Sequence, residues 1–411
     1  MEKYIFDNGL KLLYEYRPGK VSSVCIGFNA GALEEGEDFS KGTAHALEHV
    51  ISKGTKKRNE DDINIQLDRI FGFENAMTNY PYTIYYGTCF SEDLHKGIEL
   101  YSDMILNASF PKAGFKEEMN IIFQELKEWK DNSYQHCEDL LFKNSFKLRR
   151  IKETIIGNEH SIKNITLDEI KRFYHKFYVP ENCVICICSS LEFNYIYNLI
   201  KGYFGHWKKS CEKSFIEYNK NSEVLYEKNK KGIFIENVPG IKGVKIQYIF
   251  DIHHLNFKEA RVLPVVNTIF GQGVGSLLFN EIRTCQGLAY EVGSSMKNER
   301  GIKLFSIKMG TSVENIDRAI STVNSVIEKF KYSTLYFENL EIKYKIKSIK
   351  LKDEIKREKS IEFCKENVIK ELMDENYSLD KGEEAFKIKP WHINEVAGKF
   401  MNGPSIQILR G

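Results

Sequence analysis

The sequence predicts an α+β fold of two homologous domains, each built on a mixed, mostly antiparallel β-sheet flanked by helices. Two observations lead to this prediction. The chain has 411 residues, more than a single domain usually holds. Its second half also repeats the order of elements in the first half, which an internal duplication explains. An alternating strand over 244–250 is followed by a loop, a helix over 257–270 and Gly271, as in residues 21–54.

The segment between the two halves is predicted to be a linker. From Lys208 to Lys231 it is rich in Lys, Ser, Glu and Asn and shows little periodicity. We therefore predict an N-terminal domain over 1–212, a linker over 213–230 and a C-terminal domain over 231–411.

The first predicted element is a β-hairpin. Asn8-Gly9 is a strong turn signal, and it joins two apolar-rich segments at 4–6 and 10–14. The remaining elements of this half follow from the periodicity of apolar residues. They are strands over 21–28, 82–90 and 182–188, helices over 60–71, 115–130, 167–178 and 193–204, and a helix from Ser91 onward.

The segment between the strand at 21–28 and the helix at 60–71 combines helical spacing with metal chemistry. It contains His45-x-x-Glu48-His49, and residues four apart lie on the same face of a helix. Two imidazoles on one face, with room for a third ligand and a water, describe a catalytic zinc centre. Glu48 lies off the ligand face, where it would reach the water as a general base. Gly54 is the expected end of this helix.

The alternative is a chance pair of surface histidines beside a carboxylate, because short motifs carry false positives. The neighbouring Ala44, Ala46 and Leu47 favour a helix that packs inward and buries the histidines. A buried, unpaired Glu48 would be costly without a cation. We therefore prefer the metal site.

A third ligand would have to come from another element, and the helix over 115–130 offers carboxylates beside an apolar stripe. The stripe comprises Met119, Ile122, Phe123 and Leu126, and the adjacent row comprises Glu118, Ile121, Glu125 and Glu128. Carboxylates in such a position are usually solvated, which is our interpretation of Glu117 and Glu128. Glu118 and Glu125 are both candidate ligands if this helix packs beside the metal helix, and the spacing alone does not choose between them.

The second half is predicted to bind no metal. Its helix over 257–270 lacks H-x-x-E-H, and the adjacent side chains of His253 and His254 should diverge on a strand. The glycine cluster at 271–275 lacks the residues of a phosphate loop and the spacing of a dinucleotide motif, so we predict a flexible or close-packed turn. A Lys- and Glu-rich region over 336–372 is predicted to be helical with a solvated charged face.

The composition argues against nucleic acid and membrane partners. The net charge is +2, and no apolar run approaches the length that spans a bilayer. The N-terminus has no signal or transit character, and abundant Lys, Ile and Asn with eight Pro are typical of a low-GC bacterium. Nine cysteines are an odd number, which favours free thiols in a bacterial cytoplasm. Cys183, Cys186 and Cys188 are predicted to be core residues, since Cys183 faces away from the other two.

Taken together, the motifs resemble the M16 (pitrilysin-type) zinc metallopeptidases, for which H-x-x-E-H is the established inverzincin signature. They follow the family's order: Gly42-x-Ala-His-x-Leu-Glu-His, Asn75-Ala-x-Thr78, the Glu118/Glu125 helix and Arg283-x3-Gly-Leu-x-Tyr290. The resemblance runs through nearly the whole chain. Within the family it points to the half-length bacterial processing peptidases, which are similar to the mitochondrial processing peptidase.

The resemblance implies roles for the carboxylates of the first half. The family places its third zinc ligand about 76 residues after the second histidine, and that residue is Glu125. Glu118 matches a supporting carboxylate that hydrogen-bonds a ligand histidine. Asn75 and Ala76 match the edge-strand segment that pairs with the backbone of an extended peptide substrate.

The resemblance also implies that two chains cooperate. Half-length members pair, so Arg283 and Tyr290 from the half without metal would serve the partner's active site, where the tyrosine polarises the scissile carbonyl. The implied protein is a zinc endopeptidase with one Zn²⁺ per chain, which cuts unfolded peptides or disordered segments inside a clamshell formed by a homodimer. The alternative is a non-catalytic or partner-dependent subunit of a heterodimer. The intact motifs favour the enzyme, and the physiological peptide is not identified.

Overall fold

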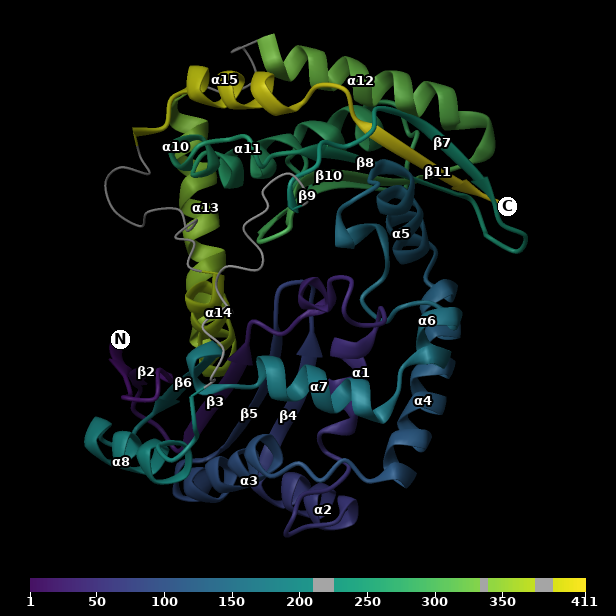
Figure 1. Cartoon of the computed structure of the whole chain (residues 1–411). Coiled ribbons are helices and arrows are strands. Elements are labelled where there is room, and N and C mark those ends of the chain that lie inside the picture. The colour runs from purple at the N-terminus through teal and green to yellow at the C-terminus, as the bar shows by residue number, and fades with distance from the viewer. Residues whose placement is uncertain (210–224, 333–338, 374–386) are drawn as a thin grey trace. The chain divides into compact units, whose positions relative to one another are not determined.

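The computed structural model describes residues 1–209, 225–332, 339–373 and 387–411 (Figure 1). The chain forms two compact units, and neither is a continuous stretch of sequence. Unit 1 comprises Met1–Glu128, Glu153–Asn221 and Lys356–Glu375, and unit 2 comprises Trp129–Lys152, Ser222–Ile355 and Asn376–Gly411. Most of the predicted linker over 213–230 lies outside the described residues, so the linker and the domain ranges stay predictions.

Unit 1 is built around a six-stranded mixed sheet with the order β1-β2-β6-β3-β5-β4. β2 and β6 run parallel, whereas the other neighbouring strands are antiparallel. The predicted hairpin at Asn8-Gly9 is confirmed, and Gly9 has a φ of +89°, which glycine adopts without strain. The strands are β1 (Glu2–Ile5), β2 (Lys11–Tyr16), β3 (Val21–Phe28), β4 (Phe71–Thr78), β5 (Thr83–Phe90) and β6 (Cys183–Ser189).

Helices cover both faces of this sheet. The helices are α1 (Thr43–Val50), α2 (Glu60–Ile70), α3 (Leu94–Leu106), α4 (Lys112–Asp131, of which the last residues belong to unit 2), α6 (Glu159–Asn164), α7 (Leu167–Phe177), α8 (Phe193–Phe204) and α14 (Ser360–Met373). α1, α3, α7 and α8 pack on one face and α14 on the other. α1 ends at Val50, so the predicted end at Gly54 was wrong: the chain turns at Ile51, and Gly54 follows with a φ of +153°.

The charged region over 336–372 is only partly a solvated surface. It contains α13 (Asn339–Glu358), whose charged face is solvated as predicted, and α14. In addition to its charges, α14 carries an apolar stripe that is buried on the unit 1 sheet. The stripe comprises Phe363, Cys364, Val368 and Leu372. This packing was not predicted, because the strands that α14 contacts lie far away in the chain.

The cysteine-rich strand β6 is part of the core. Cys186 and Cys188 face α14, and Cys183 faces the opposite helices, as the alternation of a strand requires. All three thiols are buried and free. Their predicted role as core residues is confirmed.

Unit 2 contains a five-stranded sheet with the order β7-β11-β8-β10-β9. β7 and β11 run parallel and the other pairs are antiparallel. The arrangement matches β2-β6-β3-β5-β4 of unit 1 strand for strand, which agrees with the predicted duplication. The strands are β7 (Gly232–Asn237), β8 (Val244–Asp251), β9 (Glu291–Glu299), β10 (Ile302–Thr311) and β11 (Ser405–Arg410).

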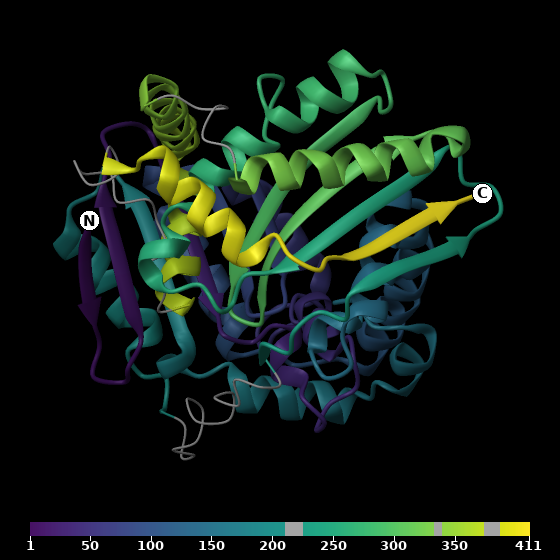
Figure 2. The same cartoon turned by 90° about the horizontal axis from the view of Figure 1, so that it is seen from above.

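The helices of unit 2 complete the same architecture. α12 and α15 lie over one face of the sheet (Figure 2), and α5 packs on the other through contacts with β8 and β11. The single helix predicted over 257–270 was wrong: two short helices form, because Pro264 begins a new helix and cannot continue one. The helices are α5 (Ser133–Ser145), α10 (Phe257–Ala260), α11 (Leu263–Phe270), the π-helix η5 (Phe279–Cys285), α12 (Ile316–Tyr332), α15 (Pro390–Phe400) and most of α13.

The predicted turn at the glycine cluster is close-packed at its first residue. A side chain at Gly271 would collide with Ser294 of β9, and Gly273 has a φ of +91°. Among the described residues, no helix is both long and apolar enough to cross a membrane.

Candidate metal centre

The helix α1 is held at its N-terminus by a buried carboxylate. Glu35 is fully buried and accepts hydrogen bonds from the backbone N–H groups of Gly42 (3.0 Å) and Ala44 (3.1 Å). These donors have no partners within the helix, and a negative charge at this end also suits the helix dipole. Gly42 takes a left-handed conformation with a φ of +102°. The start of the helix is therefore fixed, and with it the two histidines that follow.

His45, His49 and Glu125 come together in unit 1. The Oε2 atom of Glu125 lies 3.8 Å from Nε2 of His45 and 3.7 Å from Nε2 of His49. The three residues could hold one metal ion, since their ligand atoms all lie within 4.8 Å of one another. Ligand atoms about 2 Å from a tetrahedral ion are roughly 3.3 Å apart, so small side-chain movements would complete the geometry.

Glu118 contacts the Nδ1 atom of His49, the ring nitrogen that does not face Glu125. Its Oε2 atom lies 2.8 Å from Nδ1 of His49, and its Oε1 atom lies 2.5 Å from the ammonium of Lys53. Glu118 and Lys53 have side chains that are only 7% and 8% exposed, and Lys53 is also paired with Glu60 at 2.5 Å. An acceptor at Nδ1 places the imidazole proton there and leaves the lone pair of Nε2 free to bind a metal.

Burial and neighbouring charges set the protonation of these groups. Burial, together with the nearby His49, lowers the pKa of His45 to about 3, so its imidazole is neutral. Burial alone would lower the pKa of His49, but the hydrogen bond to Glu118 and the nearby carboxylates raise it. Burial likewise opposes ionisation of Glu118, yet His49 and Lys53 outweigh it and lower its pKa. The supporting carboxylate is thus held as an anion.

The donor set fits zinc. Two imidazole nitrogens and one carboxylate oxygen converge on one point, and a catalytic zinc takes three protein ligands of this kind with one position left for water. The pKa of Glu125 is raised, mainly by burial, which a cation would reverse. Glu125 lies beside both histidines and Glu118 lies at Nδ1 of His49, so the roles that the family resemblance implies for them, third ligand and supporting carboxylate, stay predictions. Glu117 and Glu128 are exposed, as predicted.

Glu48 lies beside the ligand face rather than on it. Its Oε2 atom accepts a hydrogen bond of 2.5 Å from the hydroxyl of Thr78, the last residue of β4. The pKa of Glu48 is raised, mainly by burial. A raised pKa suits a group that must accept a proton and return it near neutral pH.

Asn75 and Ala76 lie on β4, which forms one edge of the unit 1 sheet. In the part of the chain that the structure describes, β4 pairs with β5 alone. Its other side therefore presents backbone N–H and C=O groups to which an extended peptide could add. The same strand ends at Thr78, whose hydroxyl donates the hydrogen bond to Glu48.

Arg283 and Tyr290 belong to unit 2. Arg283 lies on η5 with its guanidinium 5.0 Å from the ring centre of Phe279, and Tyr290 directly precedes β9. The Tyr290 side chain is 55% exposed, and its hydroxyl accepts a hydrogen bond from the largely buried Lys245. Because Lys245 can only donate, the phenol keeps its own proton for another acceptor.

A second group of potential ligands lies in unit 2. Asp251, His253 and His254 bring ligand atoms within 4.8 Å, because β8 ends at Asp251 and the histidines lie in the following loop, not on a strand as predicted. The carboxylate of Asp251 is engaged with Arg149, a side chain that is 1% exposed and lies 3.3 Å from it. A buried arginine needs this anion as its counter-charge. We therefore keep the prediction that this half binds no metal.

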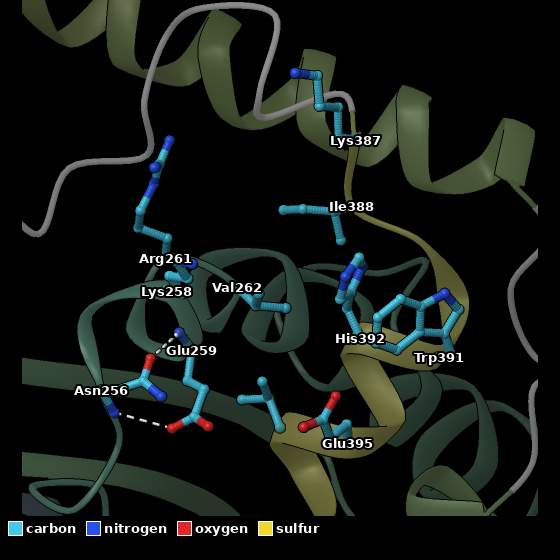
Figure 3. Close-up of a pocket in the computed structure, with 11 residues that line it drawn as sticks. Asn256, Lys258, Glu259, Arg261, Val262, Lys387, Ile388, Trp391, His392 and Glu395 are labelled. Carbon is cyan, nitrogen blue, oxygen red and sulfur yellow. Dashed lines mark hydrogen bonds between the residues drawn. The ribbon is translucent and has the colours of Figure 1, made fainter.

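One pocket in unit 2 is lined by none of the predicted site residues. It is a cavity of about 480 Å³ between α10 and α15, lined among others by Asn256, Glu259, Trp391 and His392 (Figure 3). Two of its polar groups cap α10: Asn256 and Glu259 hydrogen-bond each other's backbone N–H groups at 2.9 and 3.1 Å. These two polar groups are therefore occupied in capping the helix.

Four residues of this arrangement were not singled out from the sequence. Lys53 lies four residues after His49, so helical spacing could have suggested its contact with the same carboxylate. Thr78 was quoted in the motif but given no role. Glu35 and Lys245 carry no local signal, because their contacts depend on the folded chain.

Comparisons with known proteins agree with this geometry. Residues 11–159 match the family described as "Insulinase (Peptidase family M16)", and residues 164–341 match the "Peptidase M16 inactive domain". An uncharacterised zinc protease of Bacillus subtilis, YmxG, is 25% identical over 345 residues, 83% of this chain and 81% of that protein. The beta subunit of the rat mitochondrial-processing peptidase is 29% identical over 199 residues, 48% of this chain and 40% of the subunit.

The fold is shared with solved structures. A Helicobacter pylori protease superimposes with a TM-score of 0.88 at 20% identity, covering 100% of this chain and 99% of that one. A Pseudomonas fluorescens protein described as a peptidase M16 inactive domain has a TM-score of 0.81 at 18% identity, covering 100% and 97% of the two chains. The candidate metal ligands lie in the half that matches the insulinase description, and the half without them matches the inactive domain. The chain belongs to the M16 peptidase family.

Proposed function

We propose that this protein is a zinc-dependent endopeptidase that cuts unfolded peptides or disordered segments. The observation that carries this proposal is the convergence of His45, His49 and Glu125, with Glu48 beside them. The zinc proteases among its relatives support the same reading. The Zn²⁺ would be held by these three ligands, one ion per chain.

Each residue has a defined task in this proposal. When bound, zinc lowers the pKa of a water to about 7 and polarises the scissile carbonyl. Glu48 accepts the proton of the attacking water on a carboxylate oxygen and later gives it to the leaving amine nitrogen, a contribution of ~10²–10⁴-fold. Glu118 fixes the ring of His49 so that Nε2 points at the metal.

The substrate would bind by strand addition. Asn75 and Ala76 lie on the edge strand β4, where a peptide backbone can pair irrespective of its side chains. Only an extended segment can offer such a backbone, which is why the proposed substrates are unfolded.

Tyr290 and Arg283 would complete the site of a second chain in a homodimer. The hydroxyl proton of Tyr290, left free by Lys245, suits the oxyanion that forms at the scissile carbonyl. Sizing of the pure protein tests the pairing, and a monomer that cleaves peptides would contradict it.

The free cysteines of the described chain also support a reducing compartment such as the bacterial cytoplasm.

A non-catalytic or partner-dependent subunit is the second candidate. It is favoured by the match of residues 164–341 to an inactive domain and by a relative that is itself named a subunit of a peptidase. The complete ligand set of unit 1 favours the enzyme.

One experiment separates the two candidates. A pool of unstructured peptides is incubated with the zinc-loaded wild type and with Glu48→Gln, and fragments are followed by mass spectrometry. We expect cleavage by the wild type and none above background by Glu48→Gln at equal zinc content. If the zinc-loaded wild type alone cuts nothing, the self-sufficient enzyme is contradicted and the search moves to a partner chain.

A further inference from the structure

The hydroxyl of Thr78 is the group that holds Glu48. Thr78 is 9% exposed, and its Oγ1 atom donates to Oε2 of Glu48 at 2.5 Å. The backbone N–H of Thr78 also acts on the Glu48 carboxylate, so Thr78 offers it both a hydroxyl and a backbone donor. A glutamate side chain has several rotatable bonds, and these contacts select its orientation.

A second hydroxyl fixes the direction of that hydrogen bond. Thr83, opposite Thr78 on β5, is fully buried, and its Oγ1 atom lies 3.2 Å from that of Thr78. The proton of Thr83 is directed to the carbonyl of Ala30 at 3.0 Å. Each hydroxyl has a single proton, so Thr83 offers Thr78 only an acceptor. A carboxylate at 2.5 Å is the stronger acceptor, and the proton of Thr78 therefore points at Glu48.

The hydrogen bond from Thr78 fixes which oxygen of the Glu48 carboxylate is occupied. The Thr78 hydroxyl draws Oε2 towards β4 and leaves Oε1 of Glu48 for a further partner.

We propose that Thr78 is a positioning residue, which holds the Glu48 carboxylate so that its second oxygen faces the attacking water. The inference rests on the proposed function, because it gives Glu48 the role of base. It adds that the base is oriented from the substrate-binding strand: β4 carries Asn75 and Ala76 at its exposed edge and Thr78 at its end. One strand would thus align the peptide and the base together.

The test is a comparison of variants that differ by one hydroxyl. Thr78→Val keeps the size of the side chain and removes the hydroxyl, whereas Thr78→Ser retains it. Thr268→Val is the matched control, a buried threonine of unit 2 whose hydroxyl lies 2.8 Å from the carbonyl of Pro264 and 3.1 Å from the side-chain oxygen of Gln272. For each variant, zinc content, melting temperature, kcat and KM are measured on a peptide that the wild type cleaves.

We expect Thr78→Val to lose roughly 10- to 100-fold in kcat, part of the ~10²–10⁴-fold that a positioned base contributes. KM and zinc content should stay close to those of the wild type, and Thr78→Ser should recover most of the kcat. A purely structural role would instead lower the melting temperature and leave kcat per folded, zinc-loaded molecule unchanged. That result, or a loss as large in Thr78→Ser as in Thr78→Val, would overturn the proposal.

The variants also distinguish this inference from the proposed function. If the wild type and Glu48→Gln cleave equally, the role of Glu48 is wrong whatever Thr78 does. If Glu48→Gln is inactive and Thr78→Val is fully active, only the positioning role fails. Should Thr78→Val not fold, Thr78→Ser and Thr78→Ala make the same comparison, since they differ by a single hydroxyl.

Discussion

Each unit has its own sheet with a matching strand order, and in each a helix follows the corresponding strand, β3 or β8. The two helices differ in how far their side chains are buried. In unit 1 the helix after β3 is α1, whose histidines are partly exposed and face Glu125 of α4. In unit 2 the segment after β8 forms the short helix α10 and then α11, and every residue of α11 except Pro264 is buried. α11 thus packs the core of its unit, whereas α1 presents two candidate metal ligands. The scaffold supplies a position, and a few side chains decide whether chemistry takes place there.

The number of zinc ions bound per chain tests this difference between the two units most clearly. We expect one zinc per chain, lost entirely in His49→Ala because two ligands rarely hold zinc against solvent. His253→Ala, the matched change in the Asp251 cluster of unit 2, should leave the zinc content at one. Inductively coupled plasma mass spectrometry of dialysed protein measures both. Two zinc ions in the wild type and one in His253→Ala would show that unit 2 also binds metal.

The second prediction concerns stability in unit 2. Arg149 is almost fully buried, and Asp251 is its counter-ion. Asp251→Asn should therefore lower the free energy of unfolding by about 3–5 kcal/mol, the usual cost of leaving a buried charge unpaired. Urea unfolding measures the loss, with the exposed Asp317→Asn as control. A loss below about 1 kcal/mol would mean that water reaches Arg149.

The third prediction concerns the effect of Glu118 on zinc affinity in unit 1. Glu118→Gln keeps the size of the side chain but weakens its bonds to His49 and Lys53, so zinc affinity should fall about 10–100-fold. Competition with a chelator measures the affinity. The exposed Glu117→Gln, one residue away on α4, should bind zinc as the wild type does. Equal affinities in the two variants would contradict the supporting role of Glu118.

The smallest predicted effect is a pH dependence of unit 1 stability. Burial opposes ionisation of Asp103, but hydrogen bonds from Thr55, Arg58 and Asn107 lower its pKa. A lowered pKa stabilises the fold above the unfolded value of about 3.9, and this contribution is lost as the pH falls further. The stability difference between wild type and Asp103→Asn should therefore shrink below about pH 4 in thermal unfolding. A difference independent of pH would show that the charge of Asp103 does not matter.

Much of the fold follows from local patterns. The Asn8-Gly9 hairpin, β3, α7 and α8 were predicted almost to the residue, because turn chemistry and apolar periodicity are local properties. The missed features depend on distant partners. α14 has a Lys- and Glu-rich sequence. Its few apolar residues are buried because they pack against strands that are more than 150 residues away in the chain.

The site divides in the same way. His45, Glu48 and His49 share one turn of helix, so spacing alone brings them together. Glu118 and Glu125 are two turns apart on one face of α4, and only the position of that helix beside α1 brings Glu118 to Nδ1 and Glu125 to Nε2 of His49. The contacts of Thr78, Lys53 and Glu35 were not predicted. A hydrogen bond between two elements does not change the spacing of apolar residues in either element, so the sequence pattern does not reveal it.

If His45, His49 and Glu125 hold a catalytic zinc, two matched variants on α4 should differ in zinc content and in activity. Glu125→Gln and Glu128→Gln make the same change on one helix, at the proposed ligand and at an exposed residue. Zinc content and cleavage of an unstructured peptide are measured for both. We predict that Glu125→Gln loses both zinc and cleavage while Glu128→Gln keeps both. Full zinc content and cleavage in Glu125→Gln would contradict the account.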